Sequence, residues 1–139
     1  MLENDTKSLI AELELSMRSF IRDYRKELNE VLGDGFTSSE FSFLRAIHEN
    51  NCQNVTRLAT LLNVSNSHAT SVMDRLEAKG LLTRTRSEKD RRVVVFMLTE
   101  EGEKIFNSLD KRREAYMEER FNKLSHEEIK ELIRIFKSL

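Results

Sequence analysis

The sequence predicts a single, mostly α-helical domain with one small β-hairpin. Six segments carry apolar residues at helical spacing, and capping residues or glycines separate them. The stretch between residues 81 and 99 instead alternates and then becomes rich in β-branched residues, which is typical of a hairpin. With 39% hydrophobic and 34% charged residues over 139 positions, the chain has enough apolar content for one core and too much charge for a membrane protein.

The first two helices are predicted from their periodicity and their boundaries. A long amphipathic helix over residues 1–32 ends at Gly33-Asp34-Gly35, where the glycines favour a turn. A capping box from Thr37 to Glu40 then opens the second helix. We find no linker, internal repeat or low-complexity segment, so one domain over residues 1–139 is expected.

A short third helix and a fourth helix follow, joined by a tight turn. Asn54 is the expected N-cap of the third helix, and Asn63 tolerates the left-handed conformation that ends it. Ser65 caps the fourth helix, and Gly80 ends it. The spacing of four apolar residues predicts one buried face on this helix: Ala69, Val72, Met73 and Leu76.

A hairpin and two helices complete the chain. The hairpin is predicted from Leu82–Arg86, a turn at Ser87–Asp90, and Val93–Leu98. Thr99 caps the fifth helix, and a second capping box, Ser125 to Glu128, opens the last one. The apolar residues of this last helix are expected to face inward: Ile129, Leu132, Ile133 and Phe136.

Positive charge is concentrated in one part of a chain whose formal net charge is −1. Residues 54–92 carry eight basic and four acidic residues, whereas the remaining 100 residues carry 15 basic and 20 acidic. Such a stretch indicates a surface for a polyanion, because phosphate neutralisation and counterion release dominate nucleic-acid affinity. The same charges also fit an ordinary solvated surface, so the structural elements that carry them must decide.

The order of elements predicts a winged helix-turn-helix lobe over residues 37–99. The major groove of DNA admits one helix, whose first exposed residues reach the base edges. The free face of the fourth helix carries short polar side chains and one arginine, and its N-terminus suits a phosphate oxygen. The residues of this helix expected to contact DNA are Ser65, Asn66, Ser67, His68, Thr70, Ser71 and Arg75.

The hairpin is expected to act as the wing and to enter a minor groove, where the negative potential attracts arginine. The wing residues expected at DNA are Arg84, Arg86, Lys89, Asp90, Arg91 and Arg92, with Asp90 orienting Arg92. A helix-turn-helix pattern alone also fits an ordinary helical hairpin. Here the pattern, the basic wing and the charge contrast agree.

Four stretches of the chain resemble the MarR family of bacterial transcription regulators. They are Asn54 to Ser65, Ser71 to Leu81, Asp90-Arg91-Arg92, and Leu98-Thr99-Glu100-Glu101-Gly102. The likeness covers nearly the whole chain. The Asp-Arg-Arg wing followed by Leu-Thr-Glu-Glu-Gly is fairly specific to the family, whereas many regulators share the helix-turn-helix portion. The chain departs from the family pattern in two places: the wing turn lacks the usual proline, and position 71 is Ser where many relatives carry Arg.

The resemblance implies a homodimer that binds a pseudo-palindromic operator and usually represses. The dimer would be built from the N-terminal helix, residues 1–32, and the two C-terminal helices, residues 101–139. The residues support this independently, since these helices present more apolar surface than a small winged lobe can cover. The alternative is that the same residues form an intramolecular core. Two recognition helices on a two-fold axis predict half-sites about 10 base pairs apart.

The resemblance also implies a small-molecule effector. Family members often release DNA when a small aromatic or anionic ligand binds between the dimer helices and the DNA-binding lobe. The residues that would line such a pocket here are Arg18, Arg22, Tyr24, Phe41, Arg45 and His48. The two aromatic residues also fit a core, and the arginines also fit solvated or paired positions.

No cofactor, metal site or enzymatic activity is expected. A single cysteine, Cys52, cannot form an internal disulfide, and it lies far in sequence from the first helix, where peroxide-sensing relatives place their reactive cysteine. We therefore expect an inert thiol. The three histidines fall in separate elements with no ligand pair at i, i+4. The sequence also has no glycine-rich phosphate loop and no nucleophile elbow.

The first residues lack the features of a secretory signal, so we expect a cytoplasmic protein that joins the nucleoid when bound to DNA. The leading hypothesis is a sequence-specific DNA-binding repressor, with or without an effector. The alternative is a winged-helix protein that acts mainly by binding another protein. The first hypothesis predicts that Arg92→Ala and Ser71→Ala damage function, and the second predicts that they do not.

Overall fold

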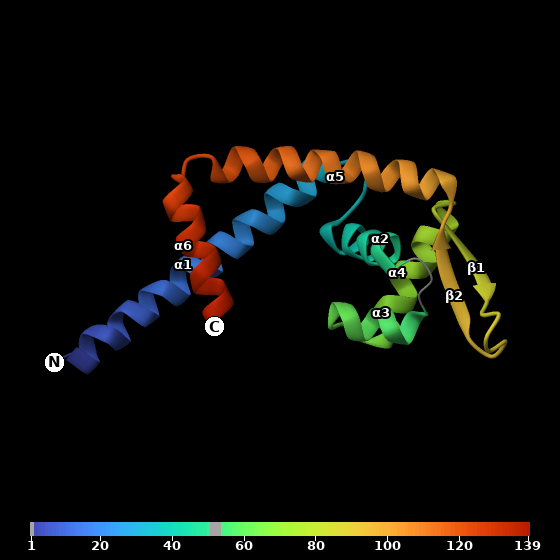
Figure 1. The fold of residues 1–139 in the computed structure, drawn as a ribbon, viewed down its shortest axis with the longest axis horizontal. Coiled ribbons are helices and arrows are strands. Elements are labelled where there is room, and N and C mark those ends of the chain that lie inside the picture. The colour runs from blue at the N-terminus through green and yellow to red at the C-terminus, as the bar shows by residue number, and fades with distance from the viewer. Residues whose placement is uncertain (1, 51–53) are drawn as a thin grey trace. The chain divides into compact units, whose positions relative to one another are not determined.

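The computed structural model describes residues 2–50 and 54–139, and it confirms a mostly helical chain with one antiparallel hairpin (Figure 1). The elements are α1 (Leu2–Leu32), α2 (Ser38–Asn50), α3 (Val55–Leu62), α4 (Asn66–Ala78), β1 (Leu82–Arg86), β2 (Val94–Leu98), α5 (Glu100–Phe121) and α6 (His126–Ser138). The chain forms two compact units, Met1–Ser38 and Ser39–Leu139. No helix in the described part of the chain is long and apolar enough to cross a membrane.

The first unit consists of α1 and the turn that ends it. Gly33, Asp34 and Gly35 follow α1 with positive φ angles of 62°, 53° and 78°, a conformation that glycine adopts without strain. The Asn29 side chain accepts a hydrogen bond of 2.7 Å from the Ser38 amide and so closes the turn. The predicted turn at the two glycines is confirmed. Large apolar side chains stay exposed along α1: Leu9, Ile10, Leu13, Leu15, Met17, Phe20 and Ile21.

The second unit has its core where α2, α3, α4 and the hairpin meet the N-terminal half of α5 (Figure 1). The predicted buried face of α4 is confirmed, since Ala69, Val72, Met73 and Leu76 are each 0% exposed. The other fully buried large side chains of this unit are Phe43, Leu44, Ile47, Leu58, Phe96 and Leu109. Glu40 of α2 is buried although it is charged, and it accepts a hydrogen bond of 3.0 Å from Lys79 Nζ, which ties α2 to the end of α4.

The boundaries of α3 and α4 follow the predicted caps. The Asn54 side chain accepts a hydrogen bond from the Arg57 amide at 2.8 Å, and Asn63 ends α3 with a φ of 54°. Ser65 Oγ accepts one from the His68 amide at 3.1 Å. Gly80 has a φ of 78°, and the next amide, of Leu81, returns to the Leu76 carbonyl at 3.0 Å. A left-handed glycine satisfies the last carbonyls of a helix in this way.

The hairpin alternates between two faces. In its register Leu82 pairs with Leu98, Arg84 with Phe96, and Arg86 with Val94. Because side chains alternate along a strand, Arg84 shares a face with the buried Leu82 and Phe96. After β2, the Thr99 amide donates a hydrogen bond to the Leu81 carbonyl at 3.0 Å, and Thr99 caps the N-terminus of α5.

The last helix differs from its prediction. The capping box at Ser125 and Glu128 is confirmed, but no residue of α6 is buried in the single chain. Leu132, Ile133 and Phe136 are 37%, 48% and 64% exposed, so the expectation that they face inward is wrong in the sense of burial: in the single chain they line an apolar groove with the end of α5. The reason is that α6 lies beyond the far end of α5, away from the helices and hairpin that form the core (Figure 1).

Candidate nucleic-acid interface

The exposed face of α4 carries short polar side chains. Ser67, Thr70, Ser71 and Arg75 are all exposed, whereas the opposite face of the helix is locked into the core. Hydroxyl groups of this size allow close approach of a helix to base edges, and a guanidinium reaches a guanine or a phosphate. The structure thus leaves these four predicted residues of α4 exposed, away from the buried face of the helix.

The N-terminus of α4 is fixed by a neighbouring helix. His68 Nε2 lies 3.2 Å from Ser39 Oγ of α2, and its ring packs against Phe43 with the ring centroids 6.3 Å apart. The imidazole is therefore held beside the first turn of α4. Ser65, Asn66 and Ser67 remain exposed around the same turn, whose free amides and helix dipole attract anions.

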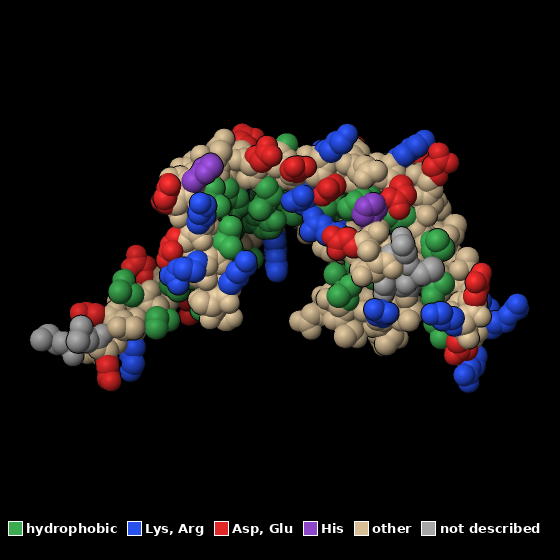
Figure 2. Space-filling view, in the orientation of Figure 1, with side chains coloured by type: hydrophobic (Ala, Val, Ile, Leu, Met, Phe, Trp, Pro, Cys, Tyr) green, Lys and Arg blue, Asp and Glu red, His purple; other side chains and the backbone are tan. Residues whose placement is uncertain are grey.

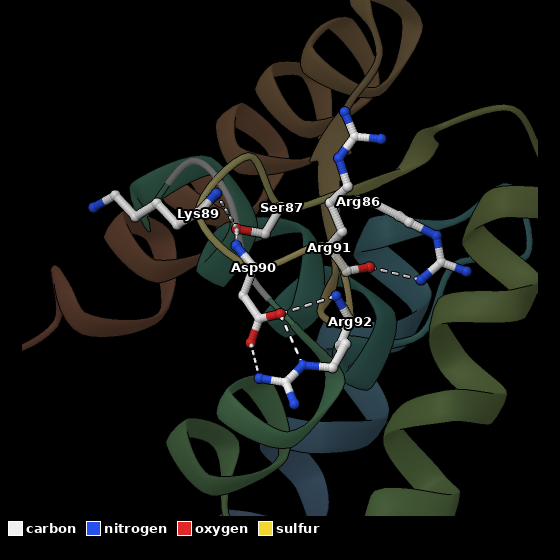
Figure 3. A network of polar contacts seen from close by, with 6 residues as sticks. All are labelled: Arg86, Ser87, Lys89, Asp90, Arg91 and Arg92. Atoms are coloured by element: carbon white, nitrogen blue, oxygen red, sulfur yellow. Dashed lines mark hydrogen bonds and ion pairs between the residues drawn. The ribbon is translucent and has the colours of Figure 1, made fainter.

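The tip of the wing is a hydrogen-bonded loop (Figure 3). Ser87 Oγ accepts hydrogen bonds from the amides of Lys89 and Asp90 at 3.3 and 3.4 Å, and the Ser87 amide donates to the Val93 carbonyl at 2.8 Å. Arg86 Nη1 donates to the Arg91 carbonyl at 2.8 Å. The Lys89 side chain points away from this network, although its amide is part of it (Figure 3). The turn thus holds its shape without a proline.

Asp90 orients Arg92, as the sequence predicts. Its carboxylate accepts three hydrogen bonds from Arg92: from the amide at 3.0 Å, from Nε at 3.2 Å and from Nη2 at 3.4 Å. The Arg92 side chain, and then its amide, hold the pKa of Asp90 below the usual value of an aspartate. Arg92 itself is 91% exposed, so its orientation is set while its charge stays accessible.

Basic side chains gather at the free end of the hairpin (Figure 2). Arg86, Lys89, Arg91 and Arg92 are exposed there, beside the acidic residues Glu88 and Asp90. The tip therefore carries a net positive charge on a narrow two-stranded support. A feature of this size and charge suits a minor groove or the phosphates beside it.

A groove beside the wing contains two residues of the α3 N-terminus that the sequence did not predict to contact DNA. It has a volume of about 730 Å³, and Asn54 and Arg57 of the α3 N-terminus line it together with Arg86 and Lys89 of the wing. Arg57 belongs to the basic stretch counted above, but its place next to the wing depends on how α3 packs. The sequence predicted only a capping role for Asn54.

Arg84 is placed differently from the other wing arginines. Its guanidinium donates to Asp74 and Glu77 of α4 and lies over the ring of Phe96, with 5.1 Å from Cζ to the ring centroid. It therefore sits at the base of the wing, against α4, while the other wing arginines extend around the tip.

The predicted effector residues divide between the two units. Arg18, Arg22 and Tyr24 lie on α1, where Arg18 pairs with Glu14 and the Tyr24 ring stacks on Phe20. The other three lie together on α2: Phe41, Arg45 and His48.

In the second unit, an open polar pocket of about 400 Å³ lies between α2 and α5. It is lined by Arg45, His48, Glu49, Phe106, Asp110 and Arg113. His48 Nδ1 lies 2.7 Å from Glu103 Oε2, and the His48 ring is 4.4 Å from that of Phe106. Asp110 lies between Arg113 and Arg45, at 3.0 and 3.8 Å. Two of the predicted effector residues therefore line one pocket.

Within residues 2–50 and 54–139, no three His, Cys, Asp or Glu side chains are arranged to hold a metal ion. The prediction for Cys52 falls outside the described residues.

The fold and this surface define the class of the protein: a winged helix-turn-helix protein with long flanking helices. Residues 36–94 match the profile of the MarR family. Over 131 residues the chain is 34% identical to the uncharacterized HTH-type transcriptional regulator YpoP of Bacillus subtilis (strain 168), covering 94% of this chain and 93% of that protein. It is 30% identical over 122 residues to the HTH-type transcriptional repressor MdtR of the same strain, covering 87% of this chain and 79% of MdtR.

A solved structure agrees with the sequence relatives. A mutant MarR from E. coli complexed with operator DNA matches with a TM-score of 0.83 and 25% identity, over 93% of this chain and 94% of that one. The chain belongs to the MarR family of transcriptional regulators.

Proposed function

We propose that the chain is a homodimeric repressor that binds a pseudo-palindromic operator, with α4 in the major groove and the wing in the adjacent minor groove. The observation that carries this proposal is that a short polar face on α4 is followed directly by a hairpin with an exposed basic tip. The relatives support it, since MdtR is named as a repressor and the E. coli MarR structure contains operator DNA.

The contacts divide by chemistry. Ser67, Thr70 and Ser71 are suited to base edges, and Arg75 to a guanine or a phosphate. Ser65, Asn66 and His68 surround the N-terminus of α4, where a phosphate would sit. The wing tip supplies the remaining positive charge through Arg86, Lys89, Arg91 and Arg92, with Asp90 orienting Arg92.

The dimer would form through residues 1–32 and 101–139, around the winged lobe of residues 37–99. Apolar side chains of α1 and α6 are exposed in the single chain, and a stripe of this extent normally marks an interface. The α5–α6 corner adds an apolar groove of about 380 Å³, with Met117, Phe121, Leu124, Ile133 and Phe136 among its lining residues. A second copy of the chain would cover these surfaces.

An effector would act through the pocket between α2 and α5. Arg45 and Arg113 share Asp110 there, and Phe106 offers an aromatic ring. A small aromatic carboxylate could stack on the ring and compete with Asp110 for the guanidinium groups.

A regulator of this kind would work in the cytoplasm, at the DNA of the nucleoid.

The test starts with selection of a binding duplex by the protein from a random-sequence library. Binding to the selected duplex and to a scrambled duplex is then measured by fluorescence anisotropy at several salt concentrations. Arg92→Ala should weaken binding about tenfold and lower the salt slope by about 0.9 for each phosphate that is no longer neutralised. Lys111→Ala serves as the matched control: Lys111 is an exposed lysine on α5 outside the winged lobe and outside the apolar groove of the proposed dimer, so neither quantity should change.

Failure to enrich any sequence would reject the repressor proposal and favour the protein-binding alternative. Repeating the titration with benzoate tests the pocket, since an effector of this class should lower affinity for the selected duplex.

A further inference from the structure

Arg84 of β1 connects the wing to the recognition helix. Its Nη2 donates to Asp74 Oδ1 and to Glu77 Oε1, both at 3.1 Å, and its Nε donates to Glu77 Oε2 at 3.3 Å. Asp74 and Glu77 stand three residues apart on α4, so they share one face of that helix. One guanidinium thus bridges two carboxylates of α4 from the strand that follows it.

The hairpin register fixes where this guanidinium lies. Arg84 is the cross-strand partner of Phe96, whose side chain is buried, and the guanidinium lies over the Phe96 ring. The Arg84 side chain is therefore held by an aromatic ring below and by two carboxylates on the side of α4. A planar guanidinium keeps such a geometry better than an ammonium group, because its donors form a rigid fork.

This arrangement makes Arg84 a poor phosphate ligand. The cluster of Arg84, Asp74 and Glu77 carries one positive and two negative charges, so its net charge repels a phosphate. Arg92 differs, because it faces one carboxylate and is 91% exposed, whereas Arg84 is 45% exposed. The wing therefore contains two kinds of arginine: those of the tip, and one that faces α4.

We propose that Arg84 is a positioning residue that fixes the wing relative to α4, so that both elements meet DNA as one body. This inference rests on the proposed function, and it replaces the sequence-based expectation that Arg84 itself contacts DNA. A selected operator requires α4 and the wing to dock in two grooves at once, whereas nonspecific binding needs only positive charge near phosphates. Breaking the bridge should therefore lower discrimination between sequences and leave the number of neutralised phosphates unchanged.

The experiment uses the full-length protein, the selected duplex and the scrambled duplex. Arg84→Gln should weaken binding to the selected duplex about tenfold and change binding to the scrambled duplex less than twofold. Its salt slope should equal that of the unmodified protein. Arg86→Gln is the matched control: it is an exposed wing arginine two residues away, and it should lower the slope by about 0.9 for each phosphate that it no longer neutralises, or about 1.8 per dimer.

Glu77→Gln breaks the same bridge from the side of α4 and is an independent test. It keeps the proposal testable if circular dichroism shows that Arg84→Gln does not fold. If Arg84 positions the wing, Glu77→Gln lowers the ratio of selected to scrambled affinity. The double variant should then discriminate no worse than Arg84→Gln alone, because both changes break one bridge.

Two results would overturn the proposal. A lower salt slope for Arg84→Gln with an unchanged affinity ratio would make Arg84 a phosphate ligand. An unchanged ratio and an unchanged slope in both single variants would mean that the bridge has no part in recognition. Neither result touches the proposed function, which fails separately if no duplex can be selected.

Discussion

Replacing Gly102 with alanine should destabilise the protein, although alanine is the better helix former. Gly102 lies in the first turn of α5 and is buried. A Cβ at this position would stand 2.1 Å from the Leu81 carbonyl oxygen and 3.1 Å from the Leu81 carbonyl carbon. The start of α5 and Leu81, which directly precedes β1, must therefore move apart by roughly 1 Å. The obstacle is backbone, which cannot rotate away as a side chain would.

The expected cost follows from the contacts at this junction. Overpacking costs about 1–3 kcal/mol. The separation also weakens the bonds from the Thr99 amide to the Leu81 carbonyl, at 3.0 Å, and from Thr99 Oγ1 to the Gly80 carbonyl, at 2.7 Å, each worth about 0.5–1.5 kcal/mol. The helix preference of alanine over glycine returns up to about 1 kcal/mol. The free energy of unfolding should therefore fall by about 2–3 kcal/mol.

Urea unfolding followed by circular dichroism, at one fixed protein concentration, measures this change. Gly35→Ala is the control, because Gly35 has a φ of 78° but no atom within 4 Å of the place that a Cβ would take; only backbone strain of about 1 kcal/mol is expected there. A loss of stability in Gly102→Ala no larger than that in Gly35→Ala, or a gain, would show that the Leu81 carbonyl does not obstruct a side chain at position 102.

Two further predictions concern the dimer and the wing. Phe136→Asp on α6 should raise the dimer dissociation constant at least a hundredfold, because the dimer would no longer bury two aromatic side chains worth about 1.5–3 kcal/mol each. Lys137→Asp, on the same exposed helix, is the control. Light scattering after gel filtration checks this, and a dimer of unchanged affinity would mean that α6 lies outside the interface. The Arg92 guanidinium lowers the pKa of Asp90, so the ion pair is complete at neutral pH, persists below the usual pKa of an aspartate, and breaks as the pH falls through the lowered value. An NMR titration of the Asp90 carboxyl should show this low midpoint in the unmodified protein. In Arg92→Ala the midpoint should return toward the usual aspartate value. An identical midpoint in both proteins would contradict the assigned ion pair.

Much of this structure could be predicted because its signals are local. Asn54, Asn63, Ser65 and Gly80 each act on the backbone within a few residues, so the limits of α3 and α4 follow from residue type alone. The buried face of α4 follows from helical periodicity, and the hairpin from its alternation. The orientation of Arg92 by Asp90 was equally accessible, since the two residues are neighbours in one turn.

Tertiary structure alone decided what depends on contacts between distant segments. The charge count treats all the arginines of the basic stretch alike, but packing of β1 against α4 gives Arg84 two carboxylate partners and leaves the tip residues exposed. Arg57 lines the wing groove because the fold places the N-terminus of α3 across from the hairpin. Periodicity marked an apolar face on α6, but only the fold showed that this face stays uncovered in the single chain, because α6 lies beyond the helices that close the core. A sequence pattern specifies which side of an element avoids water, and the surface that covers that side is decided by where the rest of the chain, or a second chain, packs.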